Sequence, residues 1–199
     1  MEIQLLSPLK TGSIPLETAL AKRRSVRSFS DEQISMPMLS QLLWAGQGIN
    51  GPGGFRTAPS AGALYPLELH IAAARVSDLP PGIYRYIPAQ HALRLIQKGD
   101  ARMSLAQAAL GQSCVREAPA VIVIAAVYSR VTVKYRERGE RYVHMEAGHA
   151  AQNICLQAAA LGAGTVAIGA FDDDPVQLVM EMERDAQPLY ILPVGKPAR

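Results

Sequence analysis

The sequence predicts an α+β fold in which helices flank a central mixed or antiparallel sheet. Residues 120–127 form a continuous apolar run, which is typical of a central strand buried on both faces. Residues 139–161 form the longest helical segment, and β-type runs at 83–87 and 91–96 indicate a hairpin. Because hairpin and crossover connections occur in the same chain, this class is favoured over a doubly wound sheet.

The first helix is indicated by signals near the amino terminus. Ser13 or Ile14 is placed to cap a helix that begins with Pro15 at its first position and runs toward Arg23. The β-branched and aromatic stretch 26–29 then ends it.

A second helix is signalled by Ser35 and Pro37, and Gly46 and Gly48 are expected to end it. Residues 50–66 are rich in Gly, Pro, Ser and Ala without any regular period, so they predict a long ordered or functional loop. The remaining predicted elements are strands over 68–75, 165–168 and 189–194, a helix over 101–110 and a helix opened by Asp174 and Pro175.

The composition suits one apolar core. At 199 residues, positions 1–199 are expected to form a single domain. Hydrophobic residues make up 49% and charged residues 19%, with a mean hydropathy of +0.07, so a buried interface or ligand pocket is expected to use the apolar surplus. No apolar run approaches the roughly 20 residues that span a bilayer, and residues 1–12 lack a signal-peptide pattern. The cytoplasm is the expected location.

The excess of basic over acidic residues suggests nucleic-acid binding as an alternative function. The net charge is +3 and the pI is near 9.0, but the basic residues are scattered, with local clusters at 22–27 and 134–141. Glu137 and Glu140 interrupt the second cluster, which therefore indicates a solvated face. We expect neither nucleic acid nor a membrane as a partner. The histidines and cysteines have no metal-ligand spacing, so no metal is expected.

The first basic cluster contains candidate ligand-binding residues. Arg23, Arg24, Ser25 and Arg27 lie where a helix ends and an extended segment begins, and alternation places Arg23, Ser25 and Arg27 on one side. Guanidinium groups bind phosphate oxygens bidentately, and a hydroxyl adds a donor. A phosphate site and a basic surface turn are equally supported by spacing alone. No glycine-rich Rossmann or Walker motif follows a strand, so any phosphate would be held by arginines.

Three further segments offer contacts to a ligand. Ile168 and Gly169 end a strand with a glycine that leaves room for a ring, and Lys134 and Tyr135 precede the long helix as possible proton-transfer groups. An isolated pair such as Lys134 and Tyr135 more often consists of surface residues. The third segment is a slim loop that consists of Pro59, Ser60, Ala61, Gly62 and Ala63. Its backbone amides carry almost no side-chain bulk, so a flat ligand could approach the main chain closely. The alternative interpretation is an ordinary turn-rich connection.

Several motifs in order give a more specific signal than any one of them. They are RRSVRSFS from Arg23, PSAGALYPLELHI from Pro59, VKYRERGERYVHMEAGHAAQNICLQAAALGAG from Val133, AIGAFDD from Ala167 and LYILPVGKP from Leu189. With these segments the chain resembles the nitroreductase superfamily, most closely its SagB-type branch, which includes azoline-oxidising dehydrogenases. The resemblance implies an intertwined homodimer with FMN at the subunit interface.

The resemblance also implies roles for individual residues. Arg23 would bind the FMN phosphate with support from Ser25, and Arg27 would lie near the pyrimidine end of the ring, where positive charge stabilises reduced flavin. Pro59, Ser60 and Ala61 would approach the ring from the partner subunit, while Ile168 and Gly169 would lie near the flavin N5.

The family's Lys-Tyr pair matches Lys134 and Tyr135, which favours the SagB-type branch. Where many nitroreductases have Asn and Gln, this chain has Ala63 and Tyr65, a pattern that its branch shares. A basic residue that reaches the phosphate commonly follows the last strand, and the candidates are Lys196 and Arg199.

The expected function is a ping-pong FMN oxidoreductase that passes hydride through N5 between NAD(P)H or another donor and a small organic acceptor. Nitroaromatics and quinones are the expected acceptors, or the enzyme oxidises an azoline-like ring. The alternative is a flavin-binding scaffold or sensor without turnover.

Overall fold

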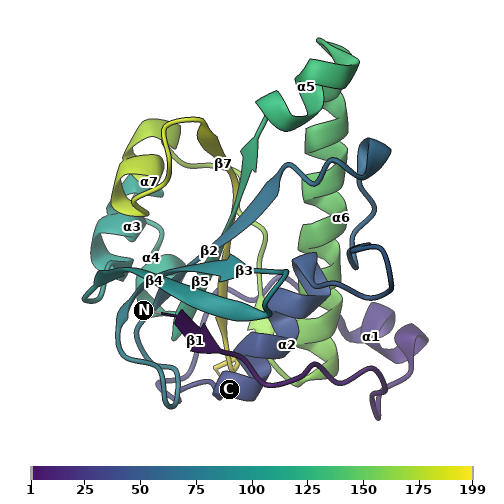
Figure 1. Ribbon diagram of the computed structural model, residues 1–199. Coiled ribbons are helices and arrows are strands. Elements are labelled where there is room, and N and C mark those ends of the chain that lie inside the picture. The colour runs from purple at the N-terminus through teal and green to yellow at the C-terminus, as the bar shows by residue number, and fades with distance from the viewer. Residues whose placement is uncertain (1, 199) are drawn as a thin grey trace.

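An antiparallel sheet forms the centre of the molecule (Figure 1). The computed structural model describes residues 2–198, and within them the seven strands are ordered β1-β4-β3-β2-β5-β7-β6 with every neighbouring pair antiparallel. Of the two predicted sheet types, the antiparallel one is formed. The strands are β1 (Glu2–Gln4), β2 (Leu67–Ala73), β3 (Gly82–Ile87), β4 (Ala92–Lys98), β5 (Ala120–Val127), β6 (Gly164–Thr165) and β7 (Ala186–Gly195).

Helices cover both faces of the sheet, as predicted for an α+β fold. Figure 1 shows α1, α2 and α6 on one side and α3, α4 and α7 on the other. The helices are α1 (Leu16–Lys22), α2 (Met36–Gln47), α3 (Arg102–Ala108), α4 (Ser113–Glu117), α5 (Ser129–Tyr135), α6 (Arg138–Ala160) and α7 (Asp173–Val179), with one 3-10 turn, η1 (Ala61–Ala63).

The central strand β5 separates two apolar cores. Its eight residues are all buried, because alternate side chains point to opposite faces of a strand and both faces are covered by helices. Ile122 and Ile124 pack with α2 and α6, whereas Val121 and Val123 pack with α3, α4 and α7. The apolar run at 120–127 therefore has the bounds and the burial that the sequence predicts.

The helix α2 continues past the glycine that was expected to end it. The Ser35 side chain accepts a hydrogen bond from the Met38 N–H at 3.3 Å, which confirms the predicted start. Gly46 lies inside the helix, and a Cβ added there would be 2.9 Å from Ile154 Cδ1 of α6. Gly46 thus permits close packing of α2 on α6, and Gly48 alone ends the helix.

Short elements account for the other differences from the sequence predictions. Pro15 flanks α1 rather than beginning it, and β6 is only two residues long, with Ile168 making an isolated bridge to Ile191. The elements β1, α4 and α5 were not predicted, because three to seven residues carry too little periodicity. No helix of residues 2–198 is long and apolar enough to cross a membrane, and the cytoplasmic location stays a prediction.

A glycine in β6 fixes how closely the segment after α1 approaches the sheet. A Cβ added at Gly164 would lie 2.7 Å from Val26 Cβ, closer than packed carbon atoms approach one another. We expect Gly164→Ala to lower the free energy of unfolding by about 1–3 kcal/mol, because Val26 is branched and cannot move away alone. Denaturant unfolding with unchanged m-values measures this loss.

The matched control is Gly148→Ala in α6, where an added Cβ meets no atom within 4 Å. Alanine favours the helix there by roughly 0.5–1 kcal/mol, so this variant should be at least as stable as the parent. Equal stability of the two variants would contradict the close approach at Gly164.

Candidate active site

The segment after α1 is fixed along the sheet edge at β6. Ser25 forms a parallel bridge with Thr165, and the Val26 N–H donates to the Thr165 carbonyl at 3.0 Å. Val26 packs inward against Gly164, so the residues on either side of it face outward. The alternation is formed from Ser25 to Arg27, and both of these residues are exposed. Arg23, which was predicted on the same side, is half-buried at the end of α1.

The arginines of this segment differ in their surroundings. Within residues 2–198, neither Arg23 nor Arg27 has a carboxylate within 4.0 Å. Arg24 differs, because its Nη1 donates to the carbonyls of Ala21 at 2.9 Å and Arg23 at 2.8 Å. Arg24 thus satisfies carbonyls at the end of α1, while Arg23 and Arg27 keep donors for a ligand.

The same sheet edge carries Ile168 and Gly169. Ile168 is buried and exchanges backbone hydrogen bonds of 2.9 Å with Ile191. Gly169 follows as an exposed residue, and a Cβ added there would meet only Tyr190, at 3.9 Å. Because Thr165 lies just before Ile168, the structure brings residues 23–30, the arginine segment, and the open backbone at Gly169 to one edge of the sheet.

The carboxyl-terminal residues run beside the arginine segment. The Ser30 N–H donates to the Lys196 carbonyl at 2.9 Å. The Lys196 ammonium forms an exposed ion pair with Glu32, so it is already engaged by a carboxylate. Arg199, the other predicted phosphate-binding candidate, lies outside the described residues.

The slim loop meets the predicted proton-transfer pair. Gly62 has a φ of 63°, in the left-handed region that favours glycine. A Cβ added at Gly62 would lie 2.8 Å from Tyr135 Oη and 2.9 Å from Lys134 Nζ. The Ser60 hydroxyl accepts the Tyr65 N–H at 2.9 Å and closes the loop. The structure thus brings together Lys134, Tyr135 and the loop, which the sequence had given only as separate candidates.

A buried carboxyl group behind this loop was missed by the sequence analysis. Glu146 on α6 is 3% exposed, and its Oε1 has no hydrogen-bond partner among the described residues. Burial raises the pKa of Glu146 to about 7, although the Ser60 hydroxyl and the Arg56 charge act in the opposite direction. The available signal was its position three residues from Val143, on the apolar face of the helix.

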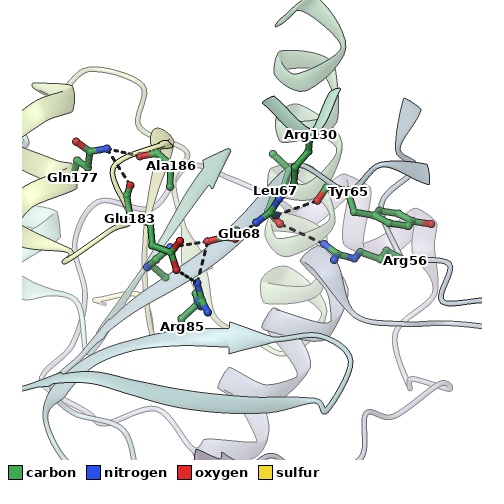
Figure 2. Close-up of polar contacts among 10 residues, drawn as sticks. Arg56, Tyr65, Leu67, Glu68, Arg85, Arg130, Gln177, Glu183 and Ala186 are labelled. Carbon is green, nitrogen blue, oxygen red and sulfur yellow. Dashed lines mark hydrogen bonds and ion pairs between the residues drawn. The ribbon is translucent and has the colours of Figure 1, made fainter. Parts of the chain in front are cut away.

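An ion-pair cluster beside the loop was missed as well, and Figure 2 shows it. Glu68 on β2 contacts Arg130 of α5 at 2.5 Å and lies 3.7 Å from Arg85. His70, with its Nε2 3.6 Å from Glu68 Oε2, and Arg130 lower the pKa of Glu68 to about 2 against the effect of burial. Glu68 is therefore ionised at neutral pH and ties α5 to the sheet.

The two groups of candidates lie at different levels along α6. The helix α1, which precedes Arg23, lines a cavity together with Leu156 near the carboxyl end of α6, whereas the Ser60 hydroxyl acts on Glu146 in the first half of that helix. Positions 146 and 156 are ten residues apart on one helix, or about 15 Å at the rise of an α-helix. Within one chain, the arginine segment and the slim loop therefore do not form one compact cluster.

The raised pKa of Glu146 predicts a pH-dependent effect of removing its charge. The folded-state pKa of about 7 exceeds the ordinary value of 4.5, so folding disfavours the ionised form. Stability from the protonated group is complete below about pH 4.5 and is lost as the pH rises toward 7. We expect Glu146→Gln to be as stable as the parent near pH 4. Above pH 7 the variant should be more stable by roughly 3 kcal/mol, because the rise of the Glu146 pKa from 4.5 to about 7 corresponds to a free energy of that size.

Unfolding free energies measured across this pH range test the prediction. Glu140→Gln, an exposed position on the same helix, serves as the control and should show no such rise. A stability difference between Glu146→Gln and the parent that does not change with pH would contradict a buried, neutral carboxyl.

Comparison with known proteins identifies the family to which the chain belongs. The sequence model of the Nitroreductase family matches residues 20–196. The protein of Methanocaldococcus jannaschii named "Putative nitroreductase MJ1384" is 43% identical over 196 residues, covering 98% of this chain and 96% of that protein. A crystal structure described as "a putative nitroreductase" from Ralstonia eutropha JMP134 has a TM-score of 0.88 at 31% identity, covering 100% of this chain and 90% of the other.

More distant matches point to the predicted branch and fold. The Microcin B17-processing protein McbC of Escherichia coli is 27% identical over 174 residues, covering 82% of this chain and 63% of McbC. A structure from Desulfovibrio desulfuricans, solved in complex with FMN, has a TM-score of 0.69 at 22% identity and covers 94% of this chain and 88% of the other, which shows a shared fold. The family prediction is confirmed, and the match to McbC agrees with the predicted SagB-type branch. The chain belongs to the nitroreductase family of oxidoreductases.

Proposed function

We propose that the protein is an FMN-dependent oxidoreductase that works as a homodimer, with each flavin bound between the arginine segment of one subunit and the slim loop of its partner. The observation that carries the proposal is the sheet edge on which Arg23 and Arg27, both without carboxylate partners in residues 2–198, lie beside the open backbone at Gly169. The FMN of the Desulfovibrio desulfuricans structure supports the choice of cofactor.

The residues present fit such a ligand. Arg23, with Ser25 beside it, offers a guanidinium fork and a hydroxyl to a phosphate group. Arg27 supplies positive charge for the pyrimidine end of a flavin, and the exposed Gly169 leaves room for the ring. The separation of Arg23 from the loop within one chain favours a loop contributed by the partner subunit.

FMN supplies the redox chemistry, because its N5 accepts and returns hydride. The chain contributes position, charge and proton transfer. Gly62 leaves the space in which Tyr135 Oη and Lys134 Nζ reach the loop. This contact supports a role for both groups in proton transfer with a substrate bound at the loop. Lys134 is exposed and Tyr135 is half-buried, which keeps both accessible.

The proposed partners of the reaction are small molecules. NAD(P)H or another donor reduces the enzyme, and a nitroaromatic or a quinone then accepts hydride in a second half-reaction. The Lys134–Tyr135 pair at the loop also favours the reverse direction, oxidation of an azoline-like ring, in which a base removes a proton. A scaffold or sensor would retain FMN and show no NAD(P)H oxidation with either acceptor.

Separate variants test the two assigned roles. Arg23→Ala should weaken FMN retention by at least about tenfold, because a charge-assisted contact to phosphate is lost. Lys134→Ala should retain FMN and lower only proton-coupled turnover, by roughly a hundredfold if Lys134 is a general acid or base. Flavin absorbance after gel filtration and steady-state kinetics measure the two effects. Equal FMN loss in both variants would remove the distinction between a phosphate-binding arginine and a proton-transfer lysine.

A complementation experiment tests whether subunits share the site. Arg23→Ala and Gly62→Val each damage one half of the proposed site, and the two chains are co-expressed with different tags. Because a mixed dimer would contain one undamaged site, roughly one quarter of the parental FMN sites should return in a random mixture. The same variants combined in one chain serve as the control. No recovery in isolated mixed dimers would argue that each chain binds flavin alone.

A further inference from the structure

A small pocket lies beside the slim loop, and three arginines contribute to its lining. Its volume is about 140 Å³, and its lining includes Gln47, Glu68, Tyr86 and three arginines, Arg56, Arg85 and Arg130. These arginines come from three separate parts of the chain, the loop before β2, the strand β3 and the helix α5. Figure 2 shows their side chains directed toward the start of β2, around Glu68.

The carboxylates at the pocket do not balance its cations. Glu68 is the one acidic residue in the lining, and it is shared between Arg130 at 2.5 Å and Arg85 at 3.7 Å. Arg85 also reaches Glu183 at 2.9 Å, but the Glu183 side chain is 71% exposed and lies outside the lining. Solvent screens such an exposed carboxylate, so the pocket keeps a net positive charge.

Arg56 has only neutral hydrogen-bond partners. Its Nη1 donates to Gln47 Oε1 at 2.5 Å and to the Leu67 carbonyl at 3.3 Å, and its guanidinium lies 4.6 Å from the centre of the Tyr65 ring. No carboxylate of residues 2–198 lies within 4.0 Å of it. Burial lowers the pKa of Arg56, with Glu146 acting in the opposite direction. A partly desolvated guanidinium without a counter-ion is costly to hold.

Two residues that line the pocket also carry buried donors without acceptors. Gln47 is fully buried, and because its Oε1 faces Arg56, its Nε2 is left without a hydrogen-bond partner. The buried Nε of Arg85 has no partner either. Buried donors are normally paired, so unpaired N–H groups from two elements in one cationic pocket indicate a missing acceptor.

We propose that this pocket binds one small oxyanion, a carboxylate or a phosphate group, between Arg56, Arg85 and the amide of Gln47. Guanidinium forks match both groups geometrically, and an oxyanion supplies the counter-ion of Arg56 and acceptors for the unpaired donors together. The volume equals that of about four or five water molecules, enough for either group and too small for a nucleotide. The pocket is separate from the arginine segment at β6, although it lies beside the slim loop, which forms the other half of the proposed flavin site.

Titration of the flavin-loaded protein with inorganic phosphate and, separately, with benzoate tests the proposal at constant ionic strength. Side-chain N–H signals of Gln47 and Arg85 in ¹H–¹⁵N NMR spectra report binding at the pocket itself. We expect saturable shifts of both signals with at least one probe. Tighter binding of benzoate would identify a carboxylate ligand, and tighter binding of phosphate a phosphorylated one.

Matched variants separate this site from other basic surfaces. Arg56→Gln and Arg85→Gln should each weaken binding of the probe by at least about tenfold, because each removes a charge-assisted contact. Arg116→Gln removes one positive charge from the exposed surface of α4 and should bind the probe like the parent. Arg23→Ala should also leave this binding unchanged, even where it releases FMN. Arg85→Gln keeps the test decisive if Arg56→Gln does not fold.

The absence of saturable shifts with both probes would overturn the proposal. Shifts that follow ionic strength alone, or that weaken equally in Arg116→Gln, would do the same. So would a Glu146→Gln variant that gains oxyanion binding absent from the parent, because Glu146 would then be the true counter-ion of Arg56.

Discussion

The close packing of α6 is the constraint on which the arrangement of the site depends. This helix packs against α2, α1, α5 and the sheet, and its buried face is built largely from small residues such as Ala147, Ala150 and Ala158. Small side chains let neighbouring backbones come close, as Gly46 of α2 does at Ile154. Loops and segments that contact α6 at different heights are thereby held at fixed separations, and Arg23 and Ser60 are two examples.

Long, strongly patterned elements could be predicted from the sequence. The strand β5 and the helix α6 were identifiable because an eight-residue apolar run and a 23-residue helical segment each carry many independent signals. The helix α5 has only seven residues, and its position depends on Glu68 and Arg130, which are 62 positions apart. An ion pair between residues so far apart in the sequence leaves no local sequence pattern from which it could be predicted.

The sequence predicted individual residues of the candidate site better than the contacts between them. The motifs indicated Arg23, the slim loop and the Lys134–Tyr135 pair, but not that Gly62 stands directly against that pair. Arg56 and Glu146 escaped notice because neither belongs to a local cluster of chemistry-bearing residues. Burial shifts the pKa values of both residues, and burial depends on the packing of the whole molecule rather than on adjacent residues in the sequence.

The short strand β6 has a consequence for the stability of this edge of the sheet. The arginine segment is joined to only two residues of β6 and to the residues that follow β7. A sheet edge with so few hydrogen-bonded partners unfolds locally at a lower free energy than the interior strands. Opening would uncover unpaired backbone groups of the kind that attract a strand from another molecule. A phosphate compound bound at this sheet edge would disfavour its local unfolding. Such binding would therefore also protect the protein against aggregation.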